Sequence, residues 1–337
     1  MKSTRIVLAS RPTGMPQPEN FRTETVELEA PGPGHALLQT LYLSLDPYMR
    51  GRMSDAPSYA PPVEVDQTMC GATVSRVLES TDPAFAPGDI VLGYAGWQTH
   101  SVEHTSYLRT LDPAAAPLTT ALGVLGMPGF TAYSGLLTIG RPQPGETVVV
   151  AAATGPVGAT VGQIAKIKGA RAIGIAGGPQ KTALLRDHFG FDAALDHRAP
   201  DFAEQLAAAT PDGIDVYFEN VGGHVFDAVL SRLNKFARIP VCGLVAGYNA
   251  TDLPPGPDRL GLLMGHILRK SLTLRGFIQT EFLDQFGEFY PAVSGWVANG
   301  DIAYLEDVVD GLDHTVEAFQ GLLTGKNLGK LIIKVAD

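Results

Sequence analysis

A glycine-rich turn after an apolar run is the tract with the clearest chemical meaning. The run covers Thr147–Ala153, and Ala153, Gly155 and Gly158 occupy the three small-residue positions of a GxGxxG pattern. Small residues there allow a tight turn, close approach of the backbone to a pyrophosphate, and close packing of a helix on a strand. Pro156 suits the first turn of that helix, whose N–H groups bind anions. The pattern predicts a dinucleotide site; an ordinary tight turn is the alternative.

The end of the next predicted strand indicates which dinucleotide binds. A site for NAD usually has an acidic residue there, which holds the ribose hydroxyls. Here Gly177 and Gly178 are followed by Lys181, with no acid among them. The glycines leave room and N–H groups for a 2′-phosphate, and the lysine supplies charge. His197 and Arg198, which follow the third strand, can converge on the same place. NADPH is therefore predicted rather than NADH, with a solvated lysine at a helix start as the alternative for Lys181.

The sequence lacks the ligand groups of a zinc dehydrogenase. It has two cysteines, Cys70 and Cys242, whereas a structural zinc site commonly needs four. We predict no metal site and interpret both cysteines as small buried hydrophobic residues. Hydride transfer without a metal suits substrates that are already electrophilic, such as enals and enones. A tyrosine hydroxyl near the developing enolate oxygen then suffices as a donor.

Composition restricts the class of protein further. Acidic residues outnumber basic ones by 35 to 25, which gives a formal net charge of -10 and argues against a nucleic-acid or membrane-surface binder. The N-terminal apolar run is too short for a signal peptide, and no stretch approaches the roughly 20 apolar residues that span a bilayer. Two cysteines without a CxxC pair favour a reducing compartment. We expect a cytoplasmic protein with a small-molecule partner.

Two kinds of sequence pattern divide the chain into a β domain and an α/β domain. Residues 1–123 contain short β-like runs separated by Pro-Gly turns. From 124 to 297, strands and helices alternate as in a doubly wound parallel sheet. Residues 298–337, which end in the run LIIKV, are expected to return to the first domain. The expected helices and strands of the α/β domain are Met127–Ile139, Thr147–Ala153, Ala159–Lys168, Arg171–Ala176, Lys181–Phe189, Ala193–Asp196, Phe202–Ala209, Asp215–Phe218, Val225–Leu233, Ala237–Gly243, Leu260–Lys270 and Ser271–Ile278.

Several linked tracts resemble one enzyme family in the same order along almost the whole chain. They resemble the medium-chain dehydrogenase/reductases that lack zinc, and within them the subfamily of leukotriene B4 dehydrogenase, prostaglandin reductase and alkenal double-bond reductase. The tracts are LSLDPYMRGRM (43–53), MPGFTAYSGL (127–136), AAATGPVGATVGQIAKIKGARAIGIAGG (151–178), FENVGG (218–223), CGLVAGYN (242–249), LPPGP (253–257) and NLGK (327–330).

The resemblance implies a fold and an activity. The expected fold is α/β: a GroES-like β domain plus a Rossmann domain with a doubly wound parallel sheet, and a cleft between the two domains. The expected activity is NADPH-dependent reduction of the carbon–carbon double bond of α,β-unsaturated aldehydes and ketones, by hydride transfer to the β-carbon, in a homodimer. Two alternatives stay open: a zinc-free NADPH quinone reductase, and a non-enzymatic NADPH-binding protein.

The resemblance also assigns residues. It places Tyr248 beside the nicotinamide ribose and Tyr48 on the substrate side, as the two candidate catalytic residues. The implied cofactor-binding residues are Gly155, Pro156, Val157, Gly158, Lys181, His197, Asn220, Cys242, Gly243, Tyr248, Phe277, Ile278 and Asn327.

Each assignment outside the glycine turn has a plainer alternative. Asn220 and Asn327 are also typical turn residues, and Tyr248 and Tyr48 can serve packing alone. Many relatives have a tyrosine at the position of His197. The residues after Ile278 differ from those of eicosanoid-reducing relatives. The physiological substrate, the stereochemistry and the proton donor therefore stay open.

Overall fold

The computed structural model describes residues 1–253 and 256–337, which form two compact units. Unit 1 comprises Met1–Gly123 and Glu306–Asp337, and unit 2 comprises Val124–Leu305. The second boundary falls after Leu305, beyond the residue 298 at which the return was expected. The reason is helix α8 (Phe286–Asn299), which packs its aromatic side chains on those of α2 (Met127–Ser134). Within the described ranges, no helix is both long and apolar enough to cross a bilayer.

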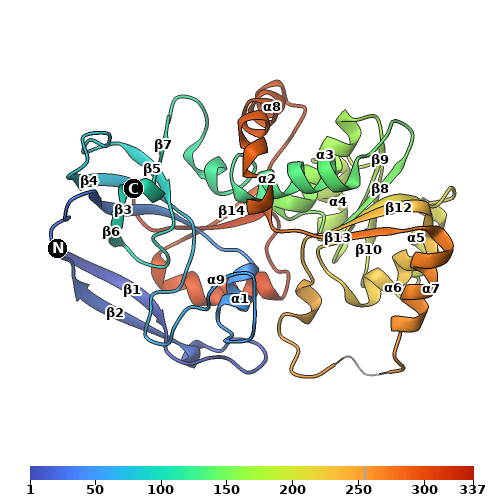
Figure 1. Ribbon diagram of the computed structural model, residues 1–337, viewed down its shortest axis with the longest axis horizontal. Helices are drawn as coiled ribbons and strands as arrows, with labels where there is room; N and C mark the ends of the chain where they lie inside the picture. The colour runs from blue at the N-terminus through green and yellow to red at the C-terminus, as the bar shows by residue number, and fades with distance from the viewer. Residues whose placement is uncertain (254–255) are drawn as a thin grey trace. The chain divides into compact units, whose positions relative to one another are not determined.

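Unit 2 is built on a six-stranded parallel sheet in the order β10-β9-β8-β11-β12-β13 (Figure 1). The doubly wound sheet predicted from the sequence is confirmed. Its central strand β8 is completely buried, as expected for a parallel strand covered on both faces. The strands are β8 (Thr147–Ala151), β9 (Arg171–Ala176), β10 (Ala193–Asp196), β11 (Ile214–Phe218), β12 (Leu233–Val241) and β13 (Thr273–Gly276).

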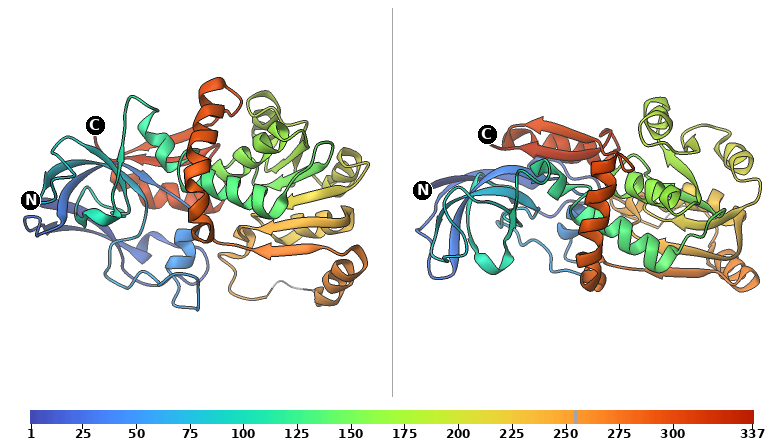
Figure 2. Two further views of the ribbon diagram at one scale, coloured as in Figure 1. Left: turned by 45° about the horizontal axis from the view of Figure 1, so that its top comes forward. Right: turned by 90° about the horizontal axis from the view of Figure 1, so that it is seen from above.

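Helices cover both faces of this sheet. Helices α2 and α3 lie side by side on one face, whereas α5 and α6 lie together on the other (Figures 1 and 2). The crossover helices are α3 (Pro156–Ile167), α4 (Pro179–Asp187), α5 (Phe202–Ala209), α6 (Gly223–Arg232) and α7 (Leu260–Lys270), and the short 3-10 helices of this unit are η5 (Val245–Gly247) and η6 (Gln279–Gln285).

One predicted helix of unit 2 is wrong in its second half. The sequence predicted a single helix over Met127–Ile139, but α2 ends at Ser134 and a π-helix, η4, covers Gly135–Gly140. A β-carbon on Gly135 would lie 2.3 Å from the ring of Phe277, so this segment packs closer to the sheet than any residue with a side chain allows. Helix α8 was not predicted at all.

Unit 1 contains a mostly antiparallel sheet that the C-terminal segment completes. Its strand order is β14-β15-β3-β4-β5-β7, with β6 paired to β3, and β1 and β2 form a separate pair. Strand β15 lies between β14 and β3 in this sheet. In Figure 2 the C-terminal strands β14 and β15 are red, whereas the N-terminal strand β3 is blue. The strands are β1 (Lys2–Leu8), β2 (Phe21–Glu27), β3 (His35–Ser44), β4 (Thr73–Ser80), β5 (Ile90–Gly93), β6 (His100–His104), β7 (Arg109–Leu111), β14 (Glu306–Asp310) and β15 (Lys330–Lys334).

Short helices and one tryptophan complete unit 1. Trp97 is fully buried between Phe21, whose ring centroid is 5.6 Å away, and Phe319 of α9, at 5.5 Å. This stack joins the N-terminal strand pair to the C-terminal helix in one core. The helices are η1 (Pro18–Asn20), α1 (Tyr48–Arg52), η2 (Thr105–Tyr107), η3 (Leu118–Leu122), η7 (Leu312–His314) and α9 (Thr315–Leu323).

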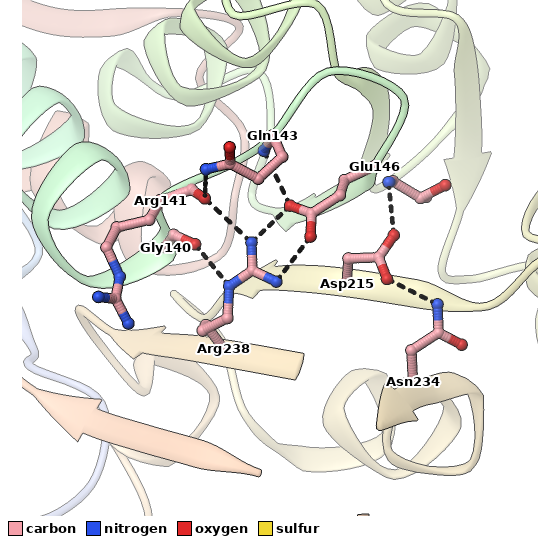
Figure 3. Close-up of polar contacts among 8 residues, drawn as sticks. Gly140, Arg141, Gln143, Glu146, Asp215, Asn234 and Arg238 are labelled. Carbon is pink, nitrogen blue, oxygen red and sulfur yellow. Dashed lines mark hydrogen bonds and ion pairs between the residues drawn. The ribbon is translucent and has the colours of Figure 1, made fainter. Parts of the chain in front are cut away.

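A group of polar contacts ties together the amino ends of the parallel strands (Figure 3). Arg238 of β12 donates to the carboxylate of Glu146, which precedes β8, and to the Gly140 carbonyl at 2.8 Å. Asp215 accepts hydrogen bonds from the Thr147 N–H at 2.9 Å and from the Asn234 side chain at 2.8 Å. These contacts lie at the edge opposite the carboxyl ends, where doubly wound sheets bind ligands. We therefore interpret them as structural.

Glu146 gives this group a pH dependence that can be measured. Burial alone would raise the pKa of Glu146, but the Arg238 guanidinium and the Gln143 N–H outweigh it and hold the pKa below its ordinary value of 4.5. The carboxylate therefore stabilises the fold above that value and loses its contribution as pH falls through the lowered pKa. We expect Glu146→Gln to lower the free energy of unfolding by about 1–3 kcal/mol at neutral pH.

Urea unfolding followed by circular dichroism at neutral pH and near pH 4 measures this effect. The difference between wild type and Glu146→Gln should shrink at the lower pH. The control is Glu204→Gln on the exposed face of α5, which should differ little from wild type at either pH. An equal loss for Glu146→Gln at both pH values would contradict the assignment.

Candidate functional site

The turn between β8 and α3 has the geometry of an anion-binding loop. Ala152 has a positive φ of 52°, and the Gly155 N–H donates to its carbonyl oxygen at 3.1 Å, which closes the turn. Helix α3 then begins at Pro156. Because the first N–H groups of a helix have no carbonyl within the helix to bind, those of Val157 and Gly158 are donors for a ligand.

The two glycines of this turn have different functions. A β-carbon on Gly158 would lie 2.5 Å from the Ala152 carbonyl oxygen, so α3 can pack on β8 only with glycine at this position. A β-carbon on Gly155 would meet only the same oxygen, at 3.4 Å, which is an ordinary contact. Gly158 therefore serves packing, whereas Gly155 leaves the ligand side of the turn open.

A cationic cluster lies at the end of β9. A β-carbon on Gly177 would lie 2.8 Å from Nε of Arg198 and 2.9 Å from Nε2 of His197. Both side chains thus cover the glycine pair on which the sequence predicted them to converge. Lys181 stands on the first turn of α4 and contributes, after burial, His224 and Arg198, to lowering the pKa of His197. The cluster brings the cationic side chains of Arg198 and Lys181 to one strand end, where they can pair with a phosphate group.

Asp196 and His224 are two further members of this region that sequence reasoning missed. The Asp196 carboxylate accepts from the N–H groups of Gly178 and Arg198, each at 2.9 Å, and these bonds lower its pKa although burial raises it. This carboxylate fixes the backbone of the glycine pair. His224, on the first turn of α6, lies with its Nε2 3.3 Å from Nδ1 of His197.

The tract after β11 joins three strands at their carboxyl ends. Asn220 donates from Nδ2 to the Ala151 carbonyl of β8 at 2.9 Å, and its own carbonyl accepts from the Val245 N–H at 3.2 Å. Asn220 is therefore more than a turn residue, because it connects the loop after β12 with the carboxyl end of β8. Its side-chain amide is already engaged with the protein.

Glu219 is a buried carboxyl group that sequence reasoning did not single out. It is 2% exposed and accepts hydrogen bonds from the N–H groups of Val221 at 2.6 Å and Gly222 at 2.8 Å, and from the Tyr217 hydroxyl at 3.1 Å. Burial nevertheless raises the pKa of Glu219. Its position beside an apolar strand gave no local signal, since two of its three partners are backbone groups of the turn that it forms.

The loop after β12 folds back onto its own start. The N–H groups of Cys242 and Gly243 donate to the Glu219 carbonyl at 2.9 Å and 3.1 Å. The chain then turns through η5, so the Tyr248 hydroxyl lies 3.2 Å from where a β-carbon on Gly243 would be. Burial and the nearby Glu219 raise the pKa of the Cys242 thiol to about 12, so the thiol stays protonated. The structure thus brings Asn220, Cys242, Gly243 and Tyr248 together.

Phe277 and Ile278 follow β13 at the same edge of the sheet. The Phe277 N–H donates to the Val241 carbonyl at 3.3 Å, and its ring is buried against Phe218 and Phe282. The Ile278 N–H donates to the Glu281 carboxylate at 2.8 Å. The Phe277 ring therefore serves the core, and the N–H groups of both residues are already bound within the protein.

Tyr48 and Asn327 belong to unit 1. Tyr48 begins the short helix α1, and burial together with the charge of Asp46 raises its pKa, so its hydroxyl is a neutral donor. Asn327 donates from Nδ2 to the Gly329 carbonyl at 2.7 Å, a bond that holds its own turn. That bond favours the structural alternative for Asn327.

A buried ion pair joins the segments that carry these two residues. Lys330 is 2% exposed, and its Nζ donates to Asp46 Oδ1 and to the Leu45 carbonyl, each at 2.7 Å. Burial lowers the pKa of Lys330, whereas Asp46 raises it. The DPYMR and NLGK tracts, far apart in the sequence, are thus neighbours in space.

Two further sequence predictions concern the LPPGP tract and metal binding. The PPGP part of the LPPGP tract includes Pro254 and Pro255, which lie outside the described residues. In the part of the chain that the structure covers, no three His, Cys, Asp or Glu side chains are grouped closely enough to hold a metal ion.

Comparison with known families matches both units. Residues 4–111 match the family described as the N-terminal domain of oxidoreductase, and residues 156–297 match the family described as zinc-binding dehydrogenase. The first match lies within unit 1, and the second lies within unit 2 and begins at the start of α3.

Curated relatives match along almost the full chain. NADPH-dependent curcumin reductase of Escherichia coli is 57% identical over 99% of this chain and 97% of its own. Prostaglandin reductase 1 of Sus scrofa is 41% identical over 95% of each chain. The NADP(+)-dependent 2-alkenal reductase of Nicotiana tabacum is 37% identical over 100% of this chain and 98% of its own.

A solved structure has nearly the same fold as this chain. The crystal structure of CurA from Vibrio vulnificus in complex with NADPH is 51% identical, covers 99% of each chain and superposes with a TM-score of 0.96. The family resemblance inferred from the sequence motifs is confirmed.

The two glycines of the β8–α3 turn allow a matched test of the site's construction. Gly158→Ala should lower the free energy of unfolding by about 1–3 kcal/mol, because its β-carbon forces α3 away from β8. Gly155→Ala should leave stability nearly unchanged, since its β-carbon has room. Urea unfolding of both variants measures the difference. Equal losses would mean that the turn is not packed as described.

Proposed function

Because the chain belongs to the zinc-independent reductases of the medium-chain dehydrogenase/reductase family, in the subfamily of prostaglandin reductase and 2-alkenal reductase, we propose that it uses NADPH to reduce the carbon–carbon double bond of α,β-unsaturated aldehydes and ketones. The chain is thus an NADP-dependent oxidoreductase. The observation that carries the proposal is the pairing of an open glycine turn with a cationic cluster at the next strand end.

Residues of unit 2 are suited to bind the pyrophosphate, the 2′-phosphate and the nicotinamide of NADPH. The turn formed by Gly155, Pro156, Val157 and Gly158 offers N–H groups to the pyrophosphate. The cluster of Lys181, His197 and Arg198 matches a 2′-phosphate, which NADH lacks. On the nicotinamide side stand Asn220, Cys242, Gly243 and Tyr248, with backbone groups of Phe277 and Ile278; the family resemblance adds Asn327 of unit 1.

The chemistry needs a donor for the oxygen of the substrate rather than a metal. When bound, NADPH supplies the hydride that the β-carbon accepts. Negative charge then develops on the carbonyl oxygen, and a neutral hydroxyl such as that of Tyr248 stabilises it by donating a hydrogen bond. Tyr48 is proposed to contact the substrate, with its hydroxyl kept protonated by burial and by Asp46. The α-carbon receives its proton from Tyr248 or from solvent.

A panel of substrates tests the reaction itself. Oxidation of NADPH is followed with a 2-alkenal, a cyclic enone, a simple quinone and no acceptor, with a chelator present throughout, and the products are identified by mass spectrometry. The expected product is the saturated aldehyde or ketone. Turnover of the quinone alone would favour the quinone-reductase alternative, and binding of NADPH with no turnover would favour a non-enzymatic function.

Lys181 provides the sharpest test of cofactor choice. Because a charge-assisted contact contributes about 1.5–3 kcal/mol, Lys181→Glu should weaken NADPH binding by about 10- to 100-fold and leave NADH binding nearly unchanged. Dissociation constants from fluorescence titration measure both. The matched control is Lys235→Glu, an exposed charge reversal near the start of β12, which should not alter cofactor choice. Equal affinity of the wild type for the two cofactors would refute the assignment.

Tyr248→Phe tests the donor. Loss of one transition-state donor lowers turnover by about 100- to 1000-fold, and less where water replaces it. We expect a fall in turnover on an enone with most of the NADPH affinity retained, measured with deuterated NADPH to establish that hydride transfer limits the rate. Tyr107→Phe, on an exposed turn of unit 1, is the control. Unchanged turnover under a full isotope effect would leave Tyr248 as a packing residue.

The homodimer expected from the resemblance is also part of the proposal. Strand β13 is the last strand of the parallel sheet, and α7 beside it exposes Leu260, Met264 and Leu268 on one helical face. A second copy of the chain is the occupant that would bury an apolar helix face next to a sheet edge. Light scattering of the purified protein measures its mass directly.

A further inference from the structure

The side chains of His197 and His224 form a directed pair. Nδ1 of His197 lies 3.3 Å from Nε2 of His224, and their ring centroids are 5.3 Å apart. The same Nε2 of His224 lies 3.2 Å from the His197 carbonyl oxygen. Because a carbonyl oxygen only accepts hydrogen bonds, His224 must carry a hydrogen on Nε2.

This hydrogen sets the proton positions of the whole pair. Facing the N–H of His224, Nδ1 of His197 is an acceptor, so neutral His197 carries its hydrogen on Nε2. That nitrogen lies 2.9 Å from the place of a β-carbon on Gly177. His197 therefore presents an N–H at the glycine pair, where the 2′-phosphate is proposed to bind.

The charges around His197 decide how readily it takes a second proton. Burial, His224 and the cations Arg198 and Lys181 lower the pKa of His197, and Asp196 at the end of β10 acts in the opposite direction. Asp196 is already engaged by the N–H groups of Gly178 and Arg198. These groups together disfavour an added proton on His197, and a phosphate dianion would reverse that balance.

We propose that the His197–His224 pair takes up one proton when the 2′-phosphate binds, so that selectivity for NADPH over NADH increases as pH falls. The inference rests on the proposed function, since it concerns the same phosphate site. A single proton is taken up because Nδ1 of His197 and Nε2 of His224, which face each other, share one hydrogen. An added proton on Nδ1 of His197 requires His224 to exchange its hydrogen from Nε2 to Nδ1. Nε2 of His224 then accepts from His197 and gives up its hydrogen bond to the His197 carbonyl oxygen. The ligand class is a phosphate monoester.

The test compares the two cofactors on one protein. Dissociation constants for NADPH and NADH are measured by calorimetry from about pH 6.5 to about pH 8.5, a range above the second pKa of about 6 of a phosphate monoester. The ratio of affinities should rise as pH falls, by at most about tenfold per pH unit for one coupled proton. Calorimetry in two buffers of different ionisation enthalpy should show uptake of up to one proton with NADPH and none with NADH.

Two variants separate the pair from other titrating groups. In the double variant His197→Asn/His224→Asn, the ratio of the NADPH affinity to the NADH affinity should no longer change over this pH range. His188→Asn, at the far end of α4, is the matched control and should retain the wild-type slope. A slope that persists in the double variant would overturn the inference.

The outcomes also separate this inference from the function on which it rests. A large ratio that does not change with pH in the wild type would overturn the proton linkage and leave the cofactor assignment standing. A ratio of one at every pH would overturn both, because the cluster would then not bind a 2′-phosphate.

Discussion

The close packing of α3 on β8 at Gly158 is the constraint on which the site of unit 2 depends. No side chain fits between the helix start and the Ala152 carbonyl, and Gly162 of the same helix approaches the ring of Phe191 within 2.0 Å of its β-carbon position. Because the helix lies this close, its first turn opens directly over the end of β8. The Asn220 side chain then reaches the same strand end. The proposed recognition of an anion in this unit is thus a consequence of helix–strand packing.

Local patterns were sufficient to predict most of the parallel-sheet unit. The ranges of β9, β10, α5 and α7 in the structure are those expected from the sequence. Buried parallel strands are continuous apolar runs, and glycine or proline separates them from their helices, so each boundary has a chemical marker. Helix α8 had no such marker, since Pro291 lies inside it and its aromatic side chains pack on those of α2, which is far away in the sequence. The π-helix η4 likewise depends on a ring from a distant strand end.

The candidate site shows the same division between local and distant information. The glycine turn and Lys181 are readable because strand, turn and helix follow one another directly. His224 was missed because its partner His197 is 27 residues away, and Lys330 was missed because Asp46 is 284 residues away. The burial of the Phe277 ring in the core was likewise not evident from its position in the sequence. Residue type and spacing identify groups that act with their neighbours in the sequence. Pairs of residues that the fold brings together from distant segments are identified only in the structure.

The position of β15 between β14 and β3 determines the order in which the chain can fold on the ribosome. Unit 2 is one continuous stretch, so it can form as soon as Leu305 has emerged. Unit 1 begins first and finishes last, because the buried bond from Lys330 to Asp46 needs both ends of the chain. At roughly 5–20 residues per second, strand β3 waits about 15–60 s for β15 to emerge and take its place in the sheet. During that interval Tyr42, Leu43 and Ser44 of β3, which pair with β15 in the complete sheet, are open to pairing with another extended chain.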